Sequence, residues 1–538
     1  MRLRGGLEVK RNFVDRAVEF IDPVRGRERF KARVQLALAG QWTGAKKDRD
    51  ATKRWNPFGG SADEDTLDDL PTLRDRSRDL QRHDPQSLGA TNTVVTSVVG
   101  TGLSLRARPD AKVLKLSPEA VQEWRTNTES KFDAWARNAI ACDLEGTLDL
   151  YQQQPLALRS ALDSGDVIAL LPMKARKASR YKLKVHLVEA DRLCNKDHAT
   201  DSDTLTAGVE KDSDGMPVAY HIARKHPGGL GIARGANEWD VIPAFGARTG
   251  RRNVIHLFDK RRPGQTRGVP YLAPVIEVLK QVTDYTYAEL QAAVIGAAFT
   301  VFIETESGNG LNLDGEGGPQ STQTASGGDI GLRPGAIVDL ARGEKVTTAN
   351  PGRPNASADV FLQAMMRRIG VALELPYEIL VKHFTASYSA ARAALLEAWR
   401  FFKGRRAWLA SMFLQPIYEA WLEEAIAMGD VIAPGFFDDP LLRAAWCGAE
   451  WIGDAPGQID PLKEIDAAAK RIETLLSTRT DESMELRGAD WMDVAERLAM
   501  EQRIIEKLKP AAPAPSSQQP PPQYPSDAPG RDEETEDE

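Results

Sequence analysis

The chain has 538 residues, of which 42% are hydrophobic and 27% charged, and its mean hydropathy is −0.39. This composition predicts a soluble globular protein of roughly two to four structural units. The formal net charge is −7, which argues against a protein that grips DNA over a broad basic surface, because neutralised phosphates supply most non-specific affinity.

Two further protein classes are disfavoured. Cys142, Cys194 and Cys447 lie far apart without metal-ligand spacing, so we expect neither a disulfide framework nor a zinc site. The apolar run at 292–299, followed by TVFI, is too short to span a bilayer, and no basic-then-apolar signal sequence opens the chain. We therefore expect a protein of a reducing compartment that is neither secreted nor inserted in a membrane.

Helices are predicted in the first part of the chain. Residues 1–60 carry one amphipathic segment within a sequence rich in Arg, Lys and Gly. A helix is predicted at 70–83, and a second one then ends at Gly100. Ser117 and Pro118 are typical of the N-cap and first residue of another helix.

Strands follow in the same region. LDLYQQQPLALRSALDSGDVIALLP predicts a helix, a tight turn and a short buried strand. The alternation in YKLKVHLVEADRL predicts a half-buried strand whose polar face carries Lys182, Lys184 and His186. DSDG predicts the turn of a hairpin, and RNVIHLFD predicts one more strand. The region from 61 to 270 is therefore expected to be a mixed α/β body.

Long helices dominate after Gly268. An apolar stripe continues through an alanine-rich end into TVFI and predicts a helix of about 30 residues, roughly 45 Å long. A Gly/Ser/Gln-rich stretch at 304–329 is too long for an ordinary connection, and IGLRPGAIVDLARGEKVTT predicts two short strands. A second long helix ends before Pro376. A third begins near Ser387 and is expected to bend or break at Pro416.

The C-terminal region predicts a helical unit and then a disordered tail. Asp460 and Pro461 are typical of the cap and first residue of that unit. From residue 510 the chain is rich in proline and then acidic, a composition that buries too little apolar surface to fold.

Catalytic patterns do not stand out in the sequence. GEKVTT lacks the glycine spacing of a phosphate-binding loop, and GGLGIARG lacks the dinucleotide pattern. His256 is interpreted as a structural histidine within a strand. Glu189 and Asp191 could ligate a metal, but pairing with Arg192 is the simpler interpretation. The acidic cluster at 63–69 is interpreted as a solvated helix start, since a Mg²⁺ site would need further carboxylates. We expect no catalytic residue, metal or cofactor.

The segment VKHFTASYSAARAALLEAWRFFKGRR joins a hydroxyl-rich loop to an arginine-rich helix. Ser387 and Ser389 could be nucleophiles at a helix N-terminus, but the nearby bases Lys382 and His383 have no third group to orient them. A capping role for either serine is sufficient.

The same helix is basic, with a single acidic residue, Glu397, over the span. We expect the basic side chains to face outward, as a solvated or intersubunit face or, alternatively, as a local contact with phosphate. They are Arg392, Arg400, Lys403, Arg405 and Arg406.

Several segments, in order, resemble the portal proteins of lambda-like tailed bacteriophages over roughly residues 40–505. The most specific are LRDRSRDLQRHDP, VVGTGLSLRARP, LRSALDSGDVIALL, LVEADRLCN, RPGQTRGVPYLAPVIEVLKQVTDYTYAELQAA, LPYEIL, SYSAARAALLEAWRFF and IGDAPGQIDPLKE. The chain departs from the family in its Gly/Ser/Gln-rich insert and its acidic tail.

The resemblance implies a helix-rich, mixed α/β portal fold with a wing, a long-helix stem, a small β-containing clip and a helical crown. By similarity, the parts are an N-terminal arm at 1–60, wing at 61–270, stem helix at 271–300, clip with the Gly-rich insert at 301–354, second stem helix at 355–375, tunnel loop and long wing helix at 376–430, crown at 431–508 and disordered tail at 509–538.

The resemblance also implies a structural function. Portal proteins of this kind form a ring, usually of twelve copies, at one capsid vertex, and double-stranded DNA passes through the channel with weak, non-specific contacts. The implied partners are a terminase motor, head-tail connector proteins, and capsid and scaffold proteins, with assembly in the host cytoplasm and no membrane. The residues expected near the channel axis are Lys382, His383, Thr385, Ser387 and Tyr388.

Two other functions are kept as alternatives to a ring. A monomeric adaptor could recruit packaging partners through the Pro-rich acidic tail. An enzyme of DNA packaging would need a Walker motif or a carboxylate triad. The sequence lacks a Walker motif and shows no convincing carboxylate triad.

Overall fold

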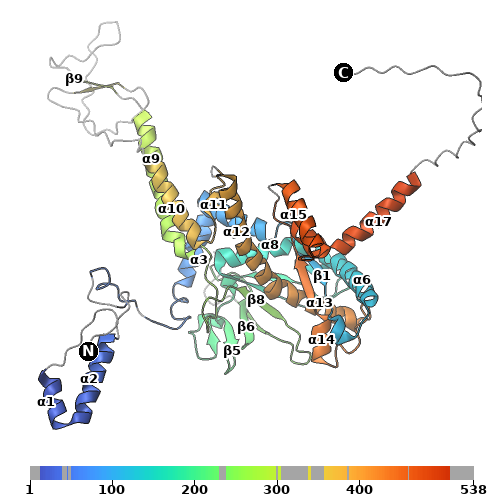
Figure 1. The fold of residues 1–538 in the computed structure, drawn as a ribbon, viewed down its shortest axis with the longest axis horizontal. Coiled ribbons are helices and arrows are strands. Elements are labelled where there is room, and N and C mark those ends of the chain that lie inside the picture. The colour runs from blue at the N-terminus through green and yellow to red at the C-terminus, as the bar shows by residue number, and fades with distance from the viewer. Residues whose placement is uncertain are drawn as a thin grey trace, which may run out of the picture. The chain divides into compact units, whose positions relative to one another are not determined.

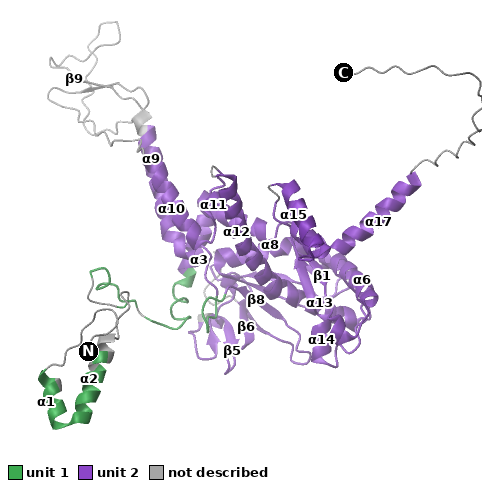
Figure 2. Cartoon of the chain, in the orientation of Figure 1, with its two compact units in different colours: residues 1–71, 260–267 green, residues 72–259, 268–538 purple. Residues whose placement is uncertain are grey.

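The computed structural model describes residues 13–38, 45, 50–57, 59–177, 179–228, 238–297, 301–304, 337–340, 357–384, 387–457 and 460–508. The chain divides into two compact units, one formed by residues 1–71 and 260–267 and the other by residues 72–259 and 268–538 (Figure 2). Among the described helices, none is both long and apolar enough to cross a membrane.

The first unit contains helices α1 (Phe13–Ile21) and α2 (Pro23–Leu38), which pack against each other. The acidic cluster lies in this unit and ends directly before α3 (Leu70–His83). Glu64, Asp65, Asp68 and Asp69 are exposed, as expected of a solvated segment, but the cluster precedes the helix and does not form its first turn. Its residues form turns, and the backbone N–H of Thr266 donates to Asp63 at 2.7 Å. The cluster therefore fastens the segment 260–267 by hydrogen bonding.

From α3 onward, helices are the most abundant element of the described chain. They are α3 (Leu70–His83), α4 (Pro85–Val98), α5 (Ala111–Leu114), α6 (Pro118–Ala136), α7 (Ala139–Cys142), α8 (Leu150–Ser164), α9 (Ile276–Ala297), α10 (Ala358–Ala372), α11 (Tyr377–Leu380), α12 (Tyr388–Leu409), α13 (Gln415–Ala427), α14 (Pro440–Trp446), α15 (Pro461–Glu473), α16 (Arg479–Arg487) and α17 (Trp491–Leu508).

The strands form small sheets. They are β1 (Ser104–Ala107), β2 (Asp166–Leu170), β3 (His186–Glu189), β4 (Leu205–Thr206), β5 (Val209–Lys211), β6 (Pro217–Ala223), β7 (Trp239–Pro243), β8 (Val254–Phe258), β9 (Val301–Glu304), β10 (Ile337–Leu340) and β11 (Ala449–Ile452). The orders are β3-β2-β8 and β4-β5-β6-β7, both antiparallel, with β1 paired antiparallel to β11. The expected helix-rich, mixed α/β fold is confirmed.

The main core forms where α8 packs on β2 and α4, and α4 packs on α12 (Figure 1). The tight turn predicted between α8 and β2 is present, and Gly165 occupies it with φ of 91°. A Cβ atom on Gly165 would lie only 2.5 Å from the carbonyl oxygen of Gly268. Glycine is therefore required both for the backbone conformation and for close packing against the segment that leads to α9.

Local capping signals predicted several helix starts correctly. The side chain of Ser117 accepts a hydrogen bond from the backbone N–H of Ala120 at the start of α6. Asp460 accepts one from Lys463 at the start of α15. The predicted hairpin is also present, with Gly215 in its turn at φ of 84°. These elements are specified by residues close in sequence, which explains why the sequence predicts them.

Lys184 contradicts the expected polar strand face. Its side chain is fully buried, and its Nζ donates to the carbonyl oxygens of Tyr181 and Leu183 at 2.9 and 3.1 Å. Only His186–Glu189 form strand β3, because the backbone N–H groups of residues 182 and 183 donate instead to Glu424 on α13. Burial lowers the pKa of Lys184, and the charge of Glu424 opposes that shift.

The rod expected after Gly268 is shorter than predicted. A 3₁₀ turn at Ala273–Val275 precedes α9, which has 22 residues, and Val301–Glu304 form β9, parallel to β10. The run of Val301, Phe302 and Ile303 favours a strand because branched and aromatic side chains suit a pleated surface. The insert at 305–329, the other strand expected beside β10 and the tail from 509 lie outside the described residues.

Near Pro416, where a bend or break is predicted, the helix continues, and a π-helical turn at Ala410–Leu414 lies between α12 and α13. Proline cannot donate a backbone hydrogen bond, and a wider turn accommodates that loss without ending the helix. Beyond it, Tyr418 and Trp421 are fully buried, and both pack edge-on against Phe132 of α6. The continuous helix is thus held by an aromatic core.

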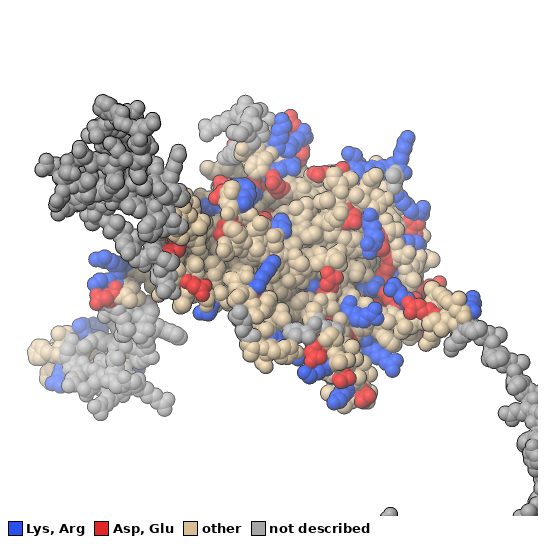
Figure 3. Space-filling view, turned by 90° about the horizontal axis from the view of Figure 1, so that it is seen from above, with Lys and Arg blue, Asp and Glu red and all other residues tan. Residues whose placement is uncertain are grey.

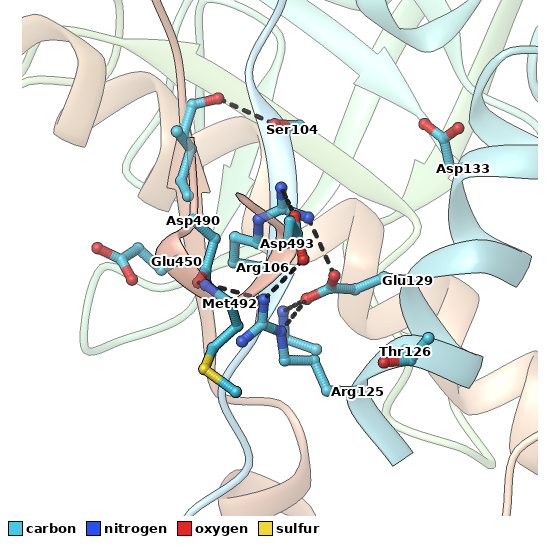
Figure 4. A network of polar contacts seen from close by, with 12 residues as sticks. Ser104, Arg106, Arg125, Thr126, Glu129, Asp133, Glu450, Asp490, Met492 and Asp493 are labelled. Atoms are coloured by element: carbon cyan, nitrogen blue, oxygen red, sulfur yellow. Dashed lines mark hydrogen bonds and ion pairs between the residues drawn. The ribbon is translucent and has the colours of Figure 1, made fainter. Parts of the chain in front are cut away.

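A buried ionic network fastens the chain just before α17 to the body (Figure 4). Arg125 on α6 pairs with Asp490 at 2.8 Å and with Glu129 at 3.0 Å, and the side chains of Arg125 and Asp490 are 6% and 1% exposed. Arg106 on β1 pairs with Glu129 and Asp493. Burial opposes the charge of Arg125, but the surrounding carboxylates outweigh it and raise its pKa.

We predict that Arg125→Met lowers the free energy of unfolding by about 3–5 kcal/mol, because it leaves the buried carboxylate of Asp490 without its nearest cation. Arg137→Met is the matched control: its pair with Asp133 is 64% and 42% exposed and should contribute less than about 1 kcal/mol. Urea unfolding followed by circular dichroism measures both. Equal losses in the two variants would contradict the assignment.

Candidate functional site on the long helix

The loop before α12 presents polar and aromatic side chains to solvent. α11 ends at Leu380, and Lys382 follows with a left-handed φ of 54°. The backbone N–H of His383 donates to the carbonyl oxygen of Glu378 at 3.1 Å, which fixes the exit from α11. His383 is exposed, while Thr385 lies outside the described residues.

Ser387 caps α12, as the sequence predicted. Its hydroxyl accepts a hydrogen bond from the backbone N–H of Ala390 at 3.4 Å. Tyr388, the first residue of the helix, is 49% exposed, and Phe384 in the loop is 53% exposed. The hydroxyl of Ser387 is therefore used for capping, in agreement with the simpler of the two interpretations.

The start of α12 lies near the start of α15. Lys463 pairs with Asp460 at 2.8 Å, and hydrogen bonding from Lys463 lowers the pKa of Asp460. The positive charge of Arg392 acts on Asp460 in the same direction. Arg392 is thus placed beside a second cation and one carboxylate at the tips of two helices.

The remaining basic residues of α12 divide into two groups. Arg400 and Lys403 face outward as expected: Arg400 pairs with Glu397 at 3.2 Å with an 82% exposed side chain, and Lys403 lies 3.6 Å from Glu485 on α16. Both pairs are exposed, and such pairs contribute little to stability. Their charges remain available to an external partner.

Arg405 and Arg406 instead turn into their own subunit. Arg405 is 17% exposed and pairs with Asp259 at 2.9 Å. Arg406 donates from Nε to the carbonyl oxygen of Val98 at 2.9 Å and from Nη2 to those of Ser97 and Asp454 at 3.1 Å. Burial lowers the pKa of Arg406, and Asp454 opposes that shift.

Sequence reasoning missed the role of Arg406 because its partners are far away along the chain. One local signal was available in the segment IGDAPG. A Cβ atom on Gly453 would lie 2.9 Å from Cζ of Arg406, so only glycine admits the guanidinium there. Asp454 next to it accepts hydrogen bonds from the backbone N–H and hydroxyl of Thr101, both at 3.0 Å.

We predict that Arg406→Ala lowers the free energy of unfolding by about 2–4 kcal/mol, because it leaves three carbonyl groups without their donor. Arg400→Ala on the same helix should change it by less than about 0.5 kcal/mol. Thermal and urea unfolding of the two variants, compared with the parent chain, provides the test. An Arg406→Ala protein as stable as the parent chain would show that the hydrogen bonds of Arg406 to the three carbonyl groups are dispensable.

The other candidate residues have structural partners. His256 is buried, and its Nε2 lies 3.0 Å from Asp166, as expected of a structural histidine. Asp191 pairs with Arg78 rather than with Arg192, which donates to the carbonyl oxygen of Ala223. Within the described ranges, no three His, Cys, Asp or Glu side chains gather in a way that could hold a metal ion. GEKVTT and most of GGLGIARG lie outside the described residues.

A groove borders the outward part of α12. It has a volume of about 980 Å³ and is lined by α10, α12 and the connection to α11. Arg367 and Val371 come from α10, and Arg400, Phe401 and Trp408 from α12.

Acidic and basic side chains are interspersed on the face seen in Figure 3, with no broad field of one sign. This surface offers local charge rather than a general attraction for polyanions.

The family model for phage portal proteins of the lambda family matches residues 48–406. The chain belongs to the lambda family of phage portal proteins. This confirms the resemblance found in the sequence and the structural function that it implies.

Curated relatives cover nearly the whole chain. Portal protein B of Escherichia phage lambda is 27% identical over 483 residues, which are 86% of this chain and 89% of that protein. The portal protein of Escherichia phage N15 is 26% identical over 481 residues, 85% of this chain and 89% of its own. The probable portal protein of Halomonas phage phiHAP-1 is 26% identical over 484 residues, 89% and 87% of the two chains.

A solved structure titled as the neck of an empty GTA particle computed with C6 symmetry is similar at a TM-score of 0.40 and 14% identity, and covers 81% of this chain and 96% of that chain. That similarity is too low to support an argument. The family itself consists of structural proteins rather than enzymes. This portal protein is accordingly a structural component of the virion.

Proposed function

We propose that this portal protein forms a ring of twelve copies at one vertex of the capsid, and that double-stranded DNA passes through the ring during packaging and ejection. The observation that carries the proposal is the match of the lambda-family portal model over residues 48–406. The net charge of −7 supports it as well, because a conduit must let DNA slide rather than bind it tightly.

The parts of the subunit take their expected functions in this proposal. The assignment is an arm at 1–60, wing at 61–270, stem helices at 271–300 and 355–375, clip at 301–354, tunnel loop and long wing helix at 376–430, crown at 431–508 and tail at 509–538. The pairing of α9 with α10 beside β9 and β10 is compatible with a stem that leads to a clip.

The loop between α11 and α12 is proposed to face the channel. Exposure of His383 and Tyr388 supports this placement, as does the helix cap at Ser387, which gives the loop a firm end. Lys382 and Thr385 belong to the same proposed lining. Side chains of this kind contact phosphate weakly and without sequence preference, as a sliding polymer requires.

The proposed partners follow from the position of such a ring. A terminase motor would dock during packaging and head-tail connector proteins afterwards, while capsid and scaffold proteins would surround the ring during assembly in the host cytoplasm. Arg392, Arg400 and Lys403 are the cations of α12 that remain available for phosphate or for another subunit, whereas Arg405 and Arg406 have partners in their own subunit.

We predict that the purified chain assembles into rings with a central hole and a mass about twelve times the subunit mass of 59.1 kDa. Negative-stain microscopy and particle mass measured in parallel provide the test, first on the chain alone and then with capsid and scaffold proteins. A chain that remains monomeric with those proteins present would overturn the ring. Deleting residues 510–538 would then test the tail as the recruiting arm of an adaptor.

We also predict that Arg392→Glu reduces the yield of DNA-filled particles roughly tenfold or more, since it places a negative charge beside the proposed DNA path. Subunit folding should be unchanged, because Arg392 makes no buried ion pair among the described residues. Arg137→Glu, an equally drastic change at the C-cap of α6, is the control. Normal packaging by the Arg392→Glu particles would remove this residue from the proposed path.

A further inference from the structure

Helices α9 and α10 form an antiparallel hairpin whose register is fixed at two points (Figure 1). The ring of Tyr285 packs on that of Phe361 with 5.2 Å between centroids, and the hydroxyl of Tyr271 donates to the carbonyl oxygen of Leu373. Tyr285 lies in the middle of α9 and Phe361 near the start of α10, whereas Tyr271 and Leu373 lie just outside the other ends of the two helices. The two contacts therefore fix the register of the part of the hairpin between them. It places Glu277 level with Arg367–Arg368.

α9 presents a continuous exposed stripe at heptad spacing. Glu277, Lys280 and Asp284 occupy its first half, and Tyr287 and Val294, 64% and 58% exposed, occupy its second. Lys280 pairs with Asp284 within the helix, whereas the only polar contact of the Glu277 side chain among the described residues is with the side-chain amide of Gln281. The first half of the stripe therefore carries one uncompensated negative charge.

α10 presents a second exposed stripe, which is mainly apolar and carries one basic residue, Arg367. Val360, Ala364, Arg367 and Val371 are exposed at intervals of three and four residues, and Val360 and Val371 are 67% and 81% exposed. Arg367 contacts Gln363 and the ring of Tyr377, and neither it nor its neighbour Arg368 has a carboxylate partner among the described residues. Two positive charges thus stand level with the negative charge on α9.

The α10 stripe continues into the groove of about 980 Å³ that α10 forms with α12. Arg367 and Val371 form one wall of this groove, and the aromatic side chains of Phe401 and Trp408 line it from α12. An apolar, partly charged concavity beside an exposed helix face is suited to a helix from another chain.

We infer that the α9 stripe of one copy packs against the α10 stripe and the adjoining groove of the next copy, with Glu277 facing Arg367 and Arg368. This rests on the proposed ring. Rotation about a ring axis leaves every residue at its own height along that axis, so groups that are level in one subunit and point along the ring remain level across the interface. Glu277 of one copy and the two arginines of the next copy then meet without any shift of one copy along the ring axis. Tyr287 meets Val360 in the same way.

The interface has two different faces, which permits a pairing experiment. One variant carries Arg367→Glu and Arg368→Glu, and the other carries Glu277→Lys and Asp284→Lys. With either variant alone, the ring population should be at least about tenfold lower than with the parent chain, because like charges then meet at every interface. Mixed in equal amounts, the two should recover rings, because alternation restores opposite charges at each interface.

Mass measurement and microscopy of each variant and of the mixture, beside the parent chain, give the readout, and unfolding curves confirm that both variants fold. Reversal of the exposed Asp79–Arg82 pair on α3 is the matched control and should leave rings intact. Rings from either variant alone, or no recovery in the mixture, would falsify this pairing while the ring itself stands. Absence of rings from the parent chain would instead remove the proposed function.

Discussion

The guanidinium of Arg406 joins three parts of the subunit that are remote in sequence. Arg406 lies on the long helix α12, and its guanidinium donates hydrogen bonds to the last carbonyl groups of α4 and to the segment that leads toward α15. The C-terminal carbonyls of a helix need donors, and a cation also suits the negative end of its dipole. This contact helps to hold α12 and the segment that leads toward α15 against α4, and it thereby supports the geometry of the cluster of Arg392, Asp460 and Lys463.

The charged residues of α12 therefore serve two purposes on one helix. Arg405 and Arg406 stabilise the subunit, whereas Arg400 and Lys403 are exposed and contribute little to its stability. The separation suits a protein that must be a stable subunit and a surface for other molecules. The ionic network around Arg125 repeats the principle at α17, where a buried cation holds a helix end while the rest of that helix remains exposed.

Local signals explain what the sequence could predict. Ser117, Ser387 and Asp460 cap helices through contacts three residues away, and Pro416 disturbs the helix in its own turn. Contacts between distant segments leave no such pattern. Lys184 alternates like an exposed strand residue, yet it is buried, and the backbone of the two preceding residues donates to Glu424, a carboxylate some 240 positions later. Arg406 looks like its exposed neighbours Arg400 and Lys403, and only the three-dimensional fold separates them. The family was recognisable because its long segments recur in order.

The π-helical turn before Pro416 has a geometric consequence for the helix that precedes it. One residue more than an α-helical turn requires shifts the azimuth of everything on one side by about 100° relative to the other. α13 is surrounded by core on nearly all sides, so its own orientation cannot vary. The turn at Ala410–Leu414 thus sets the rotation of α12 about its axis relative to α13, and so the direction in which each face of α12 points. Removing a single residue there would keep a continuous helix. It would turn the side chains of α12, including Tyr388 at its start, to a different direction around the helix axis.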